Sequence, residues 1–413
     1  MTVALEDIEA AARILAGHVT RTPTVPASAL SSRFGADIVL KLENLQLTGS
    51  FKTRGALVKL SGLGSTERRR GVIAMSAGNH AQGVAYHART LGLKATIVMP
   101  DTTPFTKVER TEELGARVVL QGGGLAECRA TVEAMARRER LAIIHPYDDP
   151  AIIAGQGTVA LELLADAPDV DTIIVPVGGG GLIAGIATAA RALRRRIRVI
   201  GVQAEAYPAM TLATRGKRRR KAPGGDASTL ADGIAVKRPG RLTSAIVRRL
   251  VSDIRLVDES AIETAIQILA NDEKVVAEGA GAAPLAYLLQ HGLPKGARKV
   301  GLIISGGNID PRLLANVLMR GLAREGRIGR LRIKLSDAPG TLATVAKLIG
   351  ERDGNIIEIV HHRLFSDVPV RMTDIDVMVE TQDAEHLRAV LGALRTAGFA
   401  ARLLSESADG SAN

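Results

Sequence analysis

Tryptophan is absent from this 413-residue sequence, aromatic residues make up 2% of it, and cysteine occurs once, at Cys128. The core must therefore be aliphatic and rich in alanine. A single cysteine excludes an intrachain disulfide and a metal site built from several cysteines. No apolar run approaches membrane-spanning length, and the N-terminal stretch MTVALEDIEAAARIL carries acids where a signal peptide carries bases. We expect a cytoplasmic protein with no membrane partner and two or three domains.

The formal net charge is +11, and much of the excess lies in RALRRRIR (191–198) and KRRRK (217–221). Neither cluster is interleaved with aromatic residues that would stack on bases. The first lies at the expected end of a helix, where cations complement the helix dipole. We therefore expect a solvated basic surface and no nucleic-acid partner, although the charge would attract anionic substrates or cofactors.

Short apolar runs alternate with helical stretches between residues 71 and 310. The runs are VIAM (72–75), ATIVM (95–99), RVVL (117–120), TIIVPV (172–177), RVIGV (198–202) and VGLII (300–304). Runs that are apolar on both faces and separated by helices predict an α/β fold with mostly parallel sheets.

Three of these runs lead directly into loops that contain glycine. The loops are SAGNH (76–80), GGGGL (178–182) and SGGN (305–308), and each precedes a predicted helix. Ligands of parallel sheets bind beyond the C-terminal ends of the strands, and backbone N–H groups at a helix start bind anions. The three loops together predict a polar small-molecule site that takes a phosphate or a carboxylate.

A second unit is expected at 331–405, after an arginine- and glycine-rich linker at 324–330 and before a disordered tail at 406–413. Its apolar periodicity predicts the order βαββαβ, which is the ferredoxin-like layout. It contains no catalytic cluster. His361 and His362 alternate across a predicted strand and are expected to bind no metal, so no metal site is predicted anywhere.

The stretch GSFKTRGA (49–56) raises the question of whether Lys52 is a surface charge or a covalent catalyst. It occurs with SAGNHAQG, HPYDDPAIIAGQGT, PVGGGGLIAG, LADG, VVAEGAGA and SGGN, in the order found in threonine ammonia-lyases (threonine dehydratases). Over residues 5–320 the chain thus resembles these fold-type II pyridoxal-phosphate enzymes. From residue 331 on it resembles a single ACT domain, a module that senses small molecules.

The resemblance implies a catalytic region at 1–323 with the two-subdomain fold of the tryptophan synthase β family. The smaller subdomain, roughly 49–150, would be inserted in the larger one. The cofactor implied is pyridoxal 5′-phosphate. The implied substrate is an amino acid, with L-threonine preferred over L-serine.

The resemblance also implies a role for each motif residue. Lys52 would hold the cofactor as a Schiff base, Phe51 would pack on its ring, Asn79 would bond the ring hydroxyl and Ser305 would meet the ring nitrogen. The remaining cofactor-binding residues would be Gly178, Gly179, Gly180, Gly181 and Leu182, which would cradle the phosphate. The substrate carboxylate would lie on the loop formed by Ser76, Ala77, Gly78, Asn79 and His80. His80 is expected to be structural rather than a general base.

In the implied reaction, the freed Lys52 amine removes the α-proton of threonine and the β-hydroxyl leaves. The products are 2-oxobutanoate and ammonia. With serine the keto acid would be pyruvate.

Two alternatives lie outside this family. Gly179, Gly181 and Ala184 fit a GxGxxA nucleotide-binding pattern, and Glu205 follows at about the spacing of a ribose-binding acid. That permissive pattern leaves GSFKTRGA and SAGNH unexplained. A binding-only protein is disfavoured because Lys52 and the other expected cofactor contacts are all present.

Serine racemase is the alternative within the family. A racemase of this kind has serine at the position of Ala77, which protonates the far face of the carbanion, and alanine has no proton to give. Racemases also tend to carry a divalent-metal site where this chain has Gln203 and Ala209. Glu205 alone would be a poor site for a hard cation.

The ACT resemblance implies an amino-acid effector, with isoleucine expected before valine. The implied effector residues are Asp337, Gly340 and Asn355. Such a site lies where two ACT domains meet, so a homo-oligomer, a dimer or a tetramer, is expected.

Overall fold

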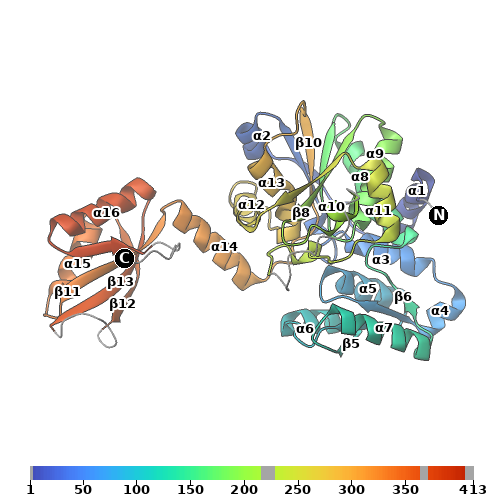
Figure 1. Cartoon of the computed structure of the whole chain (residues 1–413), viewed down its shortest axis with the longest axis horizontal. Coiled ribbons are helices and arrows are strands. Elements are labelled where there is room, and N and C mark those ends of the chain that lie inside the picture. Colours follow the sequence, from blue (N-terminus) through green and yellow to red (C-terminus); the bar gives the residue numbers. More distant parts are fainter. Residues whose placement is uncertain (1–2, 215–227, 363–370, 405–413) are drawn as a thin grey trace. The chain divides into compact units, whose positions relative to one another are not determined.

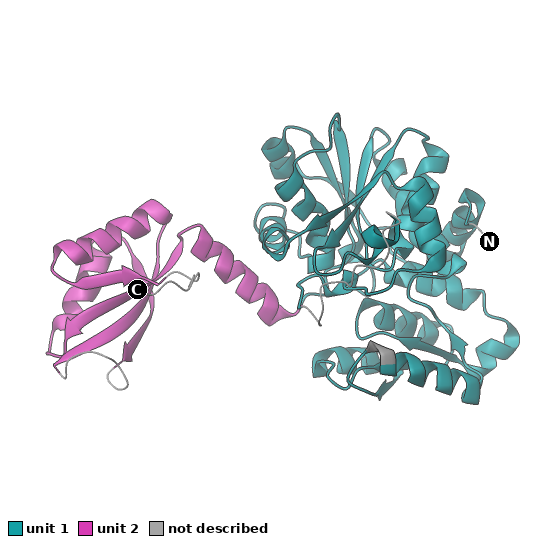
Figure 2. Ribbon diagram, in the orientation of Figure 1, with its two compact units in different colours: residues 1–309 teal, residues 310–413 magenta. Residues whose placement is uncertain are grey.

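The computed structural model describes residues 3–214, 228–362 and 371–404. The chain divides into two compact units, residues 1–309 and 310–413, which are coloured teal and magenta in Figure 2. Among the helices of the described residues, none is both long enough and apolar enough to cross a lipid bilayer. The basic cluster at 217–221 and the expected tail at 406–413 lie outside the described residues.

The larger sheet of the first unit has six strands in the order β1-β2-β10-β7-β8-β9. Figure 1 labels two of them, β8 and β10. All neighbouring pairs are parallel except β1 with β2. The strands are β1 (Thr24–Pro26), β2 (Asp37–Leu42), β7 (Thr172–Pro176), β8 (Arg198–Ala204), β9 (Asp253–Val257) and β10 (Lys299–Ile304). The central strand β7 is buried at every residue, as expected for a sheet covered by helices on both faces.

The smaller sheet has the order β5-β4-β3-β6 and is parallel throughout. Its strands are β3 (Val72–Met75), β4 (Ala95–Met99), β5 (Arg117–Leu120) and β6 (Ala142–Ile143). All four come from within the segment 49–150 that was expected to form the smaller subdomain. The prediction of an α/β fold with parallel sheets is confirmed.

Helices surround both sheets of the first unit. They are α1 (Leu5–Leu15), α2 (Ser28–Phe34), α3 (Lys52–Ser61), α4 (Ser65–Arg70), α5 (Asn79–Thr90), α6 (Phe105–Glu113), α7 (Leu125–Glu139), α8 (Pro150–Asp166), α9 (Gly181–Leu193), α10 (Ala209–Thr214), α11 (Arg241–Leu250), α12 (Glu259–Asn271) and α13 (Gly279–His291), with short 3₁₀ turns η1 (Glu43–Leu45) and η2 (Asp232–Ile234). The helix α9 ends at Leu193, so the arginine cluster at 191–198 does lie at a helix end.

The second unit begins with α14 (Pro311–Arg324) and continues with the predicted βαββαβ order. Its elements are β11 (Ile328–Ser336), α15 (Thr341–Gly350), β12 (Asn355–His362), β13 (Met372–Glu380), α16 (Ala384–Thr396) and β14 (Ala400–Leu403). The sheet order β12-β13-β11-β14 is antiparallel throughout, so the ferredoxin-like prediction is confirmed.

The expected linker at 324–330 differs from the structure at its C-terminal end. The strand β11 already starts at Ile328, and Gly329 pairs with Val379 in the ladder. Glycine suggests a linker in the sequence, but here it makes room for a helix, because a Cβ on Gly329 would lie 2.5 Å from the Leu387 side chain.

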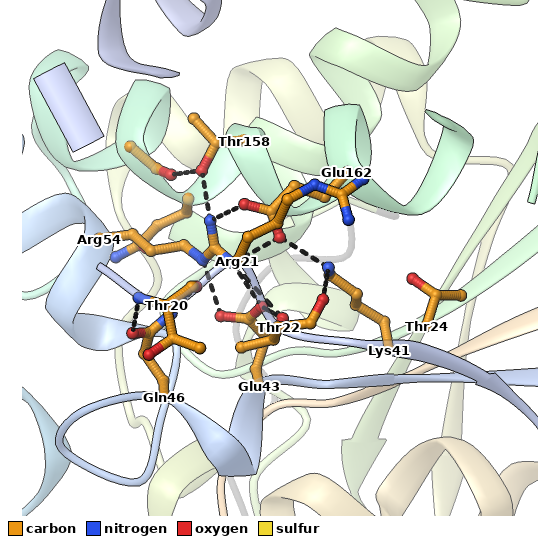
Figure 3. A network of polar contacts seen from close by, with 12 residues as sticks. Thr20, Arg21, Thr22, Thr24, Lys41, Glu43, Gln46, Arg54, Thr158 and Glu162 are labelled. Atoms are coloured by element: carbon orange, nitrogen blue, oxygen red, sulfur yellow. Dashed lines mark hydrogen bonds and ion pairs between the residues drawn. The ribbon is translucent and has the colours of Figure 1, made fainter. Parts of the chain in front are cut away.

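Four buried or nearly buried charges join α3 to the rest of the first unit (Figure 3). The Arg54 guanidinium donates to both carboxylate oxygens of Glu43, each at 2.8 Å, and to both of Glu162, at 2.6 and 2.8 Å. Lys41 donates to Glu162 at 2.6 Å and to the Thr22 carbonyl at 2.6 Å. The side chains of Arg54, Glu43 and Lys41 are fully buried, and that of Glu162 is 17% exposed. Two positive and two negative charges make this four-charge cluster neutral.

We expect Glu43→Gln to lower the free energy of unfolding by about 3 kcal/mol, because it leaves two buried cations facing one anion. Urea denaturation followed by far-UV circular dichroism measures the change. Glu139→Gln is the matched control: it breaks an exposed ion pair with Arg138, and such pairs contribute at most about 1 kcal/mol. Equal effects of the two substitutions on the free energy of unfolding would show that the buried cluster is no more sensitive to loss of one charge than an exposed ion pair.

Candidate active site

Lys52 is the first residue of α3, and the chain just before it lies against the loop that follows β10. Ser50 and Gly306 form an antiparallel bridge, and the Phe51 N–H donates to the Ser305 carbonyl at 3.1 Å. The Gly307 N–H donates to the Gly49 carbonyl at 2.9 Å. These backbone bonds bring the GSFK and SGGN motifs together from distant parts of the sequence.

The Lys52 amine is held by the chain and partly desolvated by its surroundings. Its Nζ donates to the Pro146 carbonyl at 3.0 Å and lies 5.2 Å from the centre of the Phe51 ring. Burial lowers the pKa of Lys52 to about 8, against the opposing attraction of the Glu278 carboxylate. A substantial neutral fraction near pH 8 suits an amine that acts as nucleophile and base.

The loop Gly178–Leu182 connects β7 to α9 and presents backbone donors. Among the described residues, no hydrogen-bond acceptor is found for the N–H groups of Gly178, Gly179 and Gly180. Gly180 has φ of 96°, a conformation that favours glycine. A Cβ on Gly179 would lie 2.2 Å from the Tyr147 ring, and one on Gly180 would lie 2.4 Å from Met210 Cε. A closely packed loop of unpaired donors at a helix start fits a phosphate group.

The segment HPYDD (145–149) supports both the lysine and the glycine loop. The Tyr147 hydroxyl donates to the Arg238 carbonyl at 2.8 Å. The Asp148 carboxylate accepts from three backbone N–H groups at the start of α11, at 2.9 to 3.2 Å. Asp149 caps α8, whose first turn follows directly. The chain that directly follows the Pro146 carbonyl is thus anchored at three successive residues.

The loop Ser76–His80 leads from β3 into α5, which begins at Asn79. Ser76 Oγ accepts from the Gly78 N–H at 3.2 Å and shapes the bend. The His80 ring is buried, its Nε2 lies 3.0 Å from the Ile144 carbonyl, and burial lowers its pKa to about 3. The ring is therefore neutral, and its Nε2–H is used by the Ile144 carbonyl. The part that remains for a substrate carboxylate is the set of backbone N–H groups at the start of α5.

Ser305 is 2% exposed and directly follows β10, and its carbonyl accepts from the Phe51 N–H of the GSFK motif. Its hydroxyl can donate to a ring nitrogen. Together with the glycine loop and Lys52, Ser305 makes a set of groups that fits pyridoxal phosphate.

Glu278 and Asn308 also belong to this site, although sequence analysis assigned them no role. Asn79 Nδ2 donates to Glu278 Oε1 at 2.8 Å, and Asn308 Nδ2 donates to Asn79 Oδ1 at 2.7 Å. Burial, with a contribution from the Asp232 carboxylate, raises the pKa of Glu278 to about 7. The motifs VVAEGAGA and SGGN contain both residues, so the signal was present, but their contacts were not visible in the sequence.

The stretch where a racemase metal site would lie is occupied by a hydrogen-bonded glutamine. Gln203 is buried; its Nε2 donates to the carbonyls of Val177 and Tyr207, and its Oε1 accepts twice from Thr211. Within the described part of the chain, His, Cys, Asp and Glu residues do not gather in groups of three that would hold a metal ion.

The expected effector residues lie in the second unit but do not come together within one copy. Gly340, with φ of 87°, immediately precedes α15, and Asp337 lies in the turn before it. Asn355 begins β12, beyond the other end of α15, where its Nδ2 donates to Glu380 at 3.1 Å. A helix of ten residues is about 15 Å long.

A sequence model of pyridoxal-phosphate-dependent enzymes matches residues 15–306, and an ACT domain model matches residues 329–399. Because the first match covers most of the chain, the protein belongs to the family of pyridoxal-phosphate-dependent enzymes.

Within this family the chain is 42% identical to the L-threonine ammonia-lyase of Thermotoga maritima over 402 residues, 97% of this chain and 100% of that protein. The crystal structure of a threonine deaminase from T.th. is 41% identical, with a TM-score of 0.70 over 74% of this chain and 99% of that one. The structure of maize serine racemase is 32% identical, with a TM-score of 0.73 over 79% of this chain and 100% of that one. The fold is thus shared by lyase and racemase, and the sequence lies nearer to the lyases.

We expect Glu278→Gln to remove a pH dependence from the stability of the cofactor-free protein. The usual carboxyl pKa of 4.5 is raised to about 7 in the folded state, so the folded state binds the proton more tightly. That stabilisation is complete below pH 4.5 and is lost as the pH rises to about 7, a total of about 3 kcal/mol.

Urea midpoints at pH 5 and pH 8 test this expectation. The urea midpoint of Glu278→Gln should rise relative to that of the wild type as the pH rises. The control Glu133→Gln, on an exposed part of α7, should keep a constant difference from the wild type. An equal difference in urea midpoint between Glu278→Gln and the wild type at both pH values would contradict the raised pKa of Glu278.

Proposed function

We propose that this chain is an L-threonine ammonia-lyase that converts L-threonine to 2-oxobutanoate and ammonia, and L-serine to pyruvate more slowly. The observation that carries the proposal is the placement of the Lys52 amine, with its lowered pKa, in a site that also contains an anion-binding glycine loop. The relatives named above as threonine ammonia-lyase and threonine deaminase support the choice of substrate.

Pyridoxal phosphate, when bound, supplies the electrophilic carbon for an amine and the electron sink for a carbanion. Gly178 to Leu182 would hold its phosphate through backbone N–H groups, and Ser305 would meet its ring nitrogen. A neutral hydroxyl at that position does not force a proton onto the ring, which suits rapid loss of a β-substituent over a long-lived carbanion.

The chain's own groups then bind the substrate and move its α-proton. The N–H groups at the start of α5 would hold the substrate carboxylate. Lys52, with a pKa near 8, would accept the α-proton at Nζ. The Pro146 carbonyl, 3.0 Å from that nitrogen, would orient the amine while it is free of the cofactor.

Serine racemase is the second candidate, favoured by the similar fold of the maize enzyme. The residue at position 77 argues against racemase activity. Ala77 carries no group that could deliver a proton to the far face of a carbanion, so elimination has no competitor there.

A keto-acid assay with L-threonine and L-serine tests the proposal on the wild type and on Lys52→Ala. We expect the purified wild type to show a visible absorbance band and to release 2-oxobutanoate faster than pyruvate. Lys52→Ala should lose both the band and the turnover, by a factor of at least about 10³, while its far-UV circular dichroism is unchanged. Full activity in protein free of pyridoxal phosphate, or D-serine formed as fast as keto acid, would overturn it.

We further propose that a branched-chain amino acid, isoleucine first and valine second, modulates the enzyme through the ACT unit. Asp337 and Gly340 lie beyond one end of α15 and Asn355 beyond the other. A shared site would therefore combine residues of two copies, which requires a homo-oligomer. Effector binding would act by favouring one arrangement of the oligomer.

Truncation after Arg324 removes all four strands of the second unit and should leave an active lyase that no longer responds to isoleucine. Asp337→Ala in the full chain should weaken the response without lowering the basal rate, which separates effector binding from loss of the fold. Rate measurements across an isoleucine titration check both. A truncated enzyme with the response of the full chain would place regulation in the first unit.

A further inference from the structure

Three side chains at the active site form a directed chain of hydrogen bonds: Asn308, Asn79 and Glu278. Asn308 Nδ2 donates to the Thr48 carbonyl at 2.8 Å and to Asn79 Oδ1 at 2.7 Å, and it lies 3.4 Å from Gln82 Oε1. Asn79 Nδ2 donates to Glu278 Oε1 at 2.8 Å.

The donor-to-acceptor direction of these hydrogen bonds is set by a backbone group. The Thr48 carbonyl can only accept, so the atom of Asn308 that faces it must be the nitrogen. That nitrogen has two hydrogens, and the second one goes to Asn79 Oδ1 at 2.7 Å, which is much nearer than Gln82 Oε1 at 3.4 Å. The Asn79 nitrogen is therefore turned the other way, towards Glu278. One of its two N–H groups is used there, and one remains.

The helix that carries Asn79, α5, lies against the backbone of Lys52. Gly83 lies one helical turn after Asn79 and on the same face. A Cβ on Gly83 would lie only 3.2 Å from the carbonyl carbon of Lys52, so this face of α5 packs directly on the lysine backbone.

We propose that Asn308 is a positioning residue that locks the Asn79 amide with its free N–H directed at the ring oxygen of the bound cofactor. The proposal rests on the cofactor site described above. An N–H donor at that point stabilises the ring oxygen as an anion. A carbonyl oxygen in the same place would instead require the ring oxygen to keep its proton.

Glu278 cannot set this orientation by itself. As a carboxylate it accepts from Asn79, and as a neutral acid it has both a donor and an acceptor oxygen and would accommodate either orientation. The charged groups that influence it are Asp232, Lys107 and Lys52. The orientation of the Asn79 amide must therefore be fixed by Asn308, whose own orientation depends on no titratable group.

The absorption spectrum of the holoenzyme tests the lock. The bound cofactor absorbs in the visible when its ring oxygen is ionised and in the near ultraviolet when that oxygen is protonated. In Asn308→Asp a carboxylate replaces the donor, so only the Asn79 nitrogen can face it and the amide must turn. We expect the ratio of the near-ultraviolet to the visible band to rise roughly tenfold, the scale of one hydrogen bond to a charged oxygen.

Asn308→Ala removes the lock without repelling the Asn79 carbonyl and should give a smaller rise. Asn79→Asp, which has no N–H, should match Asn308→Asp. Asn271→Asp makes the same chemical change on the exposed end of α12 and should leave the spectrum unchanged. Spectra are normalised to bound cofactor, because a merely structural role of Asn308 would lower cofactor retention and leave the band ratio as it was.

An unchanged band ratio in Asn308→Asp, beside a normal wild-type spectrum, would overturn the lock alone. If Asn308→Asp does not fold, an unchanged ratio in Asn308→Ala and Asn79→Asp would overturn it in the same way. A wild type with only the near-ultraviolet band would overturn the lock alone, and a wild type with neither band would overturn the cofactor assignment and this inference together.

Discussion

The four-charge cluster of Arg54, Glu43, Glu162 and Lys41 is the constraint on which the site depends. Burying an unpaired charge is strongly unfavourable, so each charge of the cluster must be paired with an opposite one. The elements α3, β2, η1 and α8 must therefore pack in the arrangement that forms these ion pairs. Arg54 is two residues after Lys52 on α3. The backbone that carries the lysine is therefore held by a neutral cluster of buried charges.

At the candidate active site, burial acts on groups that have no ion-pair partner within the cluster. Desolvation lowers the pKa of Lys52 and raises that of Glu278, so both groups are drawn towards their neutral forms near neutral pH. The neutral His80 adds no charge. The glycine loop likewise presents uncharged backbone N–H groups. The large positive charge of the chain is therefore not concentrated at the groups that would meet the substrate.

The sequence alone predicted six of the parallel strands, the ferredoxin-like unit and the motifs that meet at the site. It did not predict β2, β6 or β9. Lys41 and Arg255 interrupt the apolar patterns of β2 and β9, and β6 has only two residues. Lys41 is nevertheless buried, since Glu162 from a distant helix pairs with it. The roles of Pro146, Glu278 and Asn308 were also missed. Each depends on a contact with Lys52 or Asn79 across about a hundred or more residues of chain, and residue type does not encode such contacts.

The glycine loop limits how this protein could change over evolution. Tyr147 lies against Gly179 and Gly181, while Met210 and Thr243 lie against Gly180, so a side chain at any of these three positions would collide with its neighbours. In the proposed function the loop would bind a phosphate through its backbone, and its four glycines have no side chain to vary. A descendant that bound a different group here would have to change the surrounding residues first, and Tyr147 and Met210 are the positions where such a change would begin.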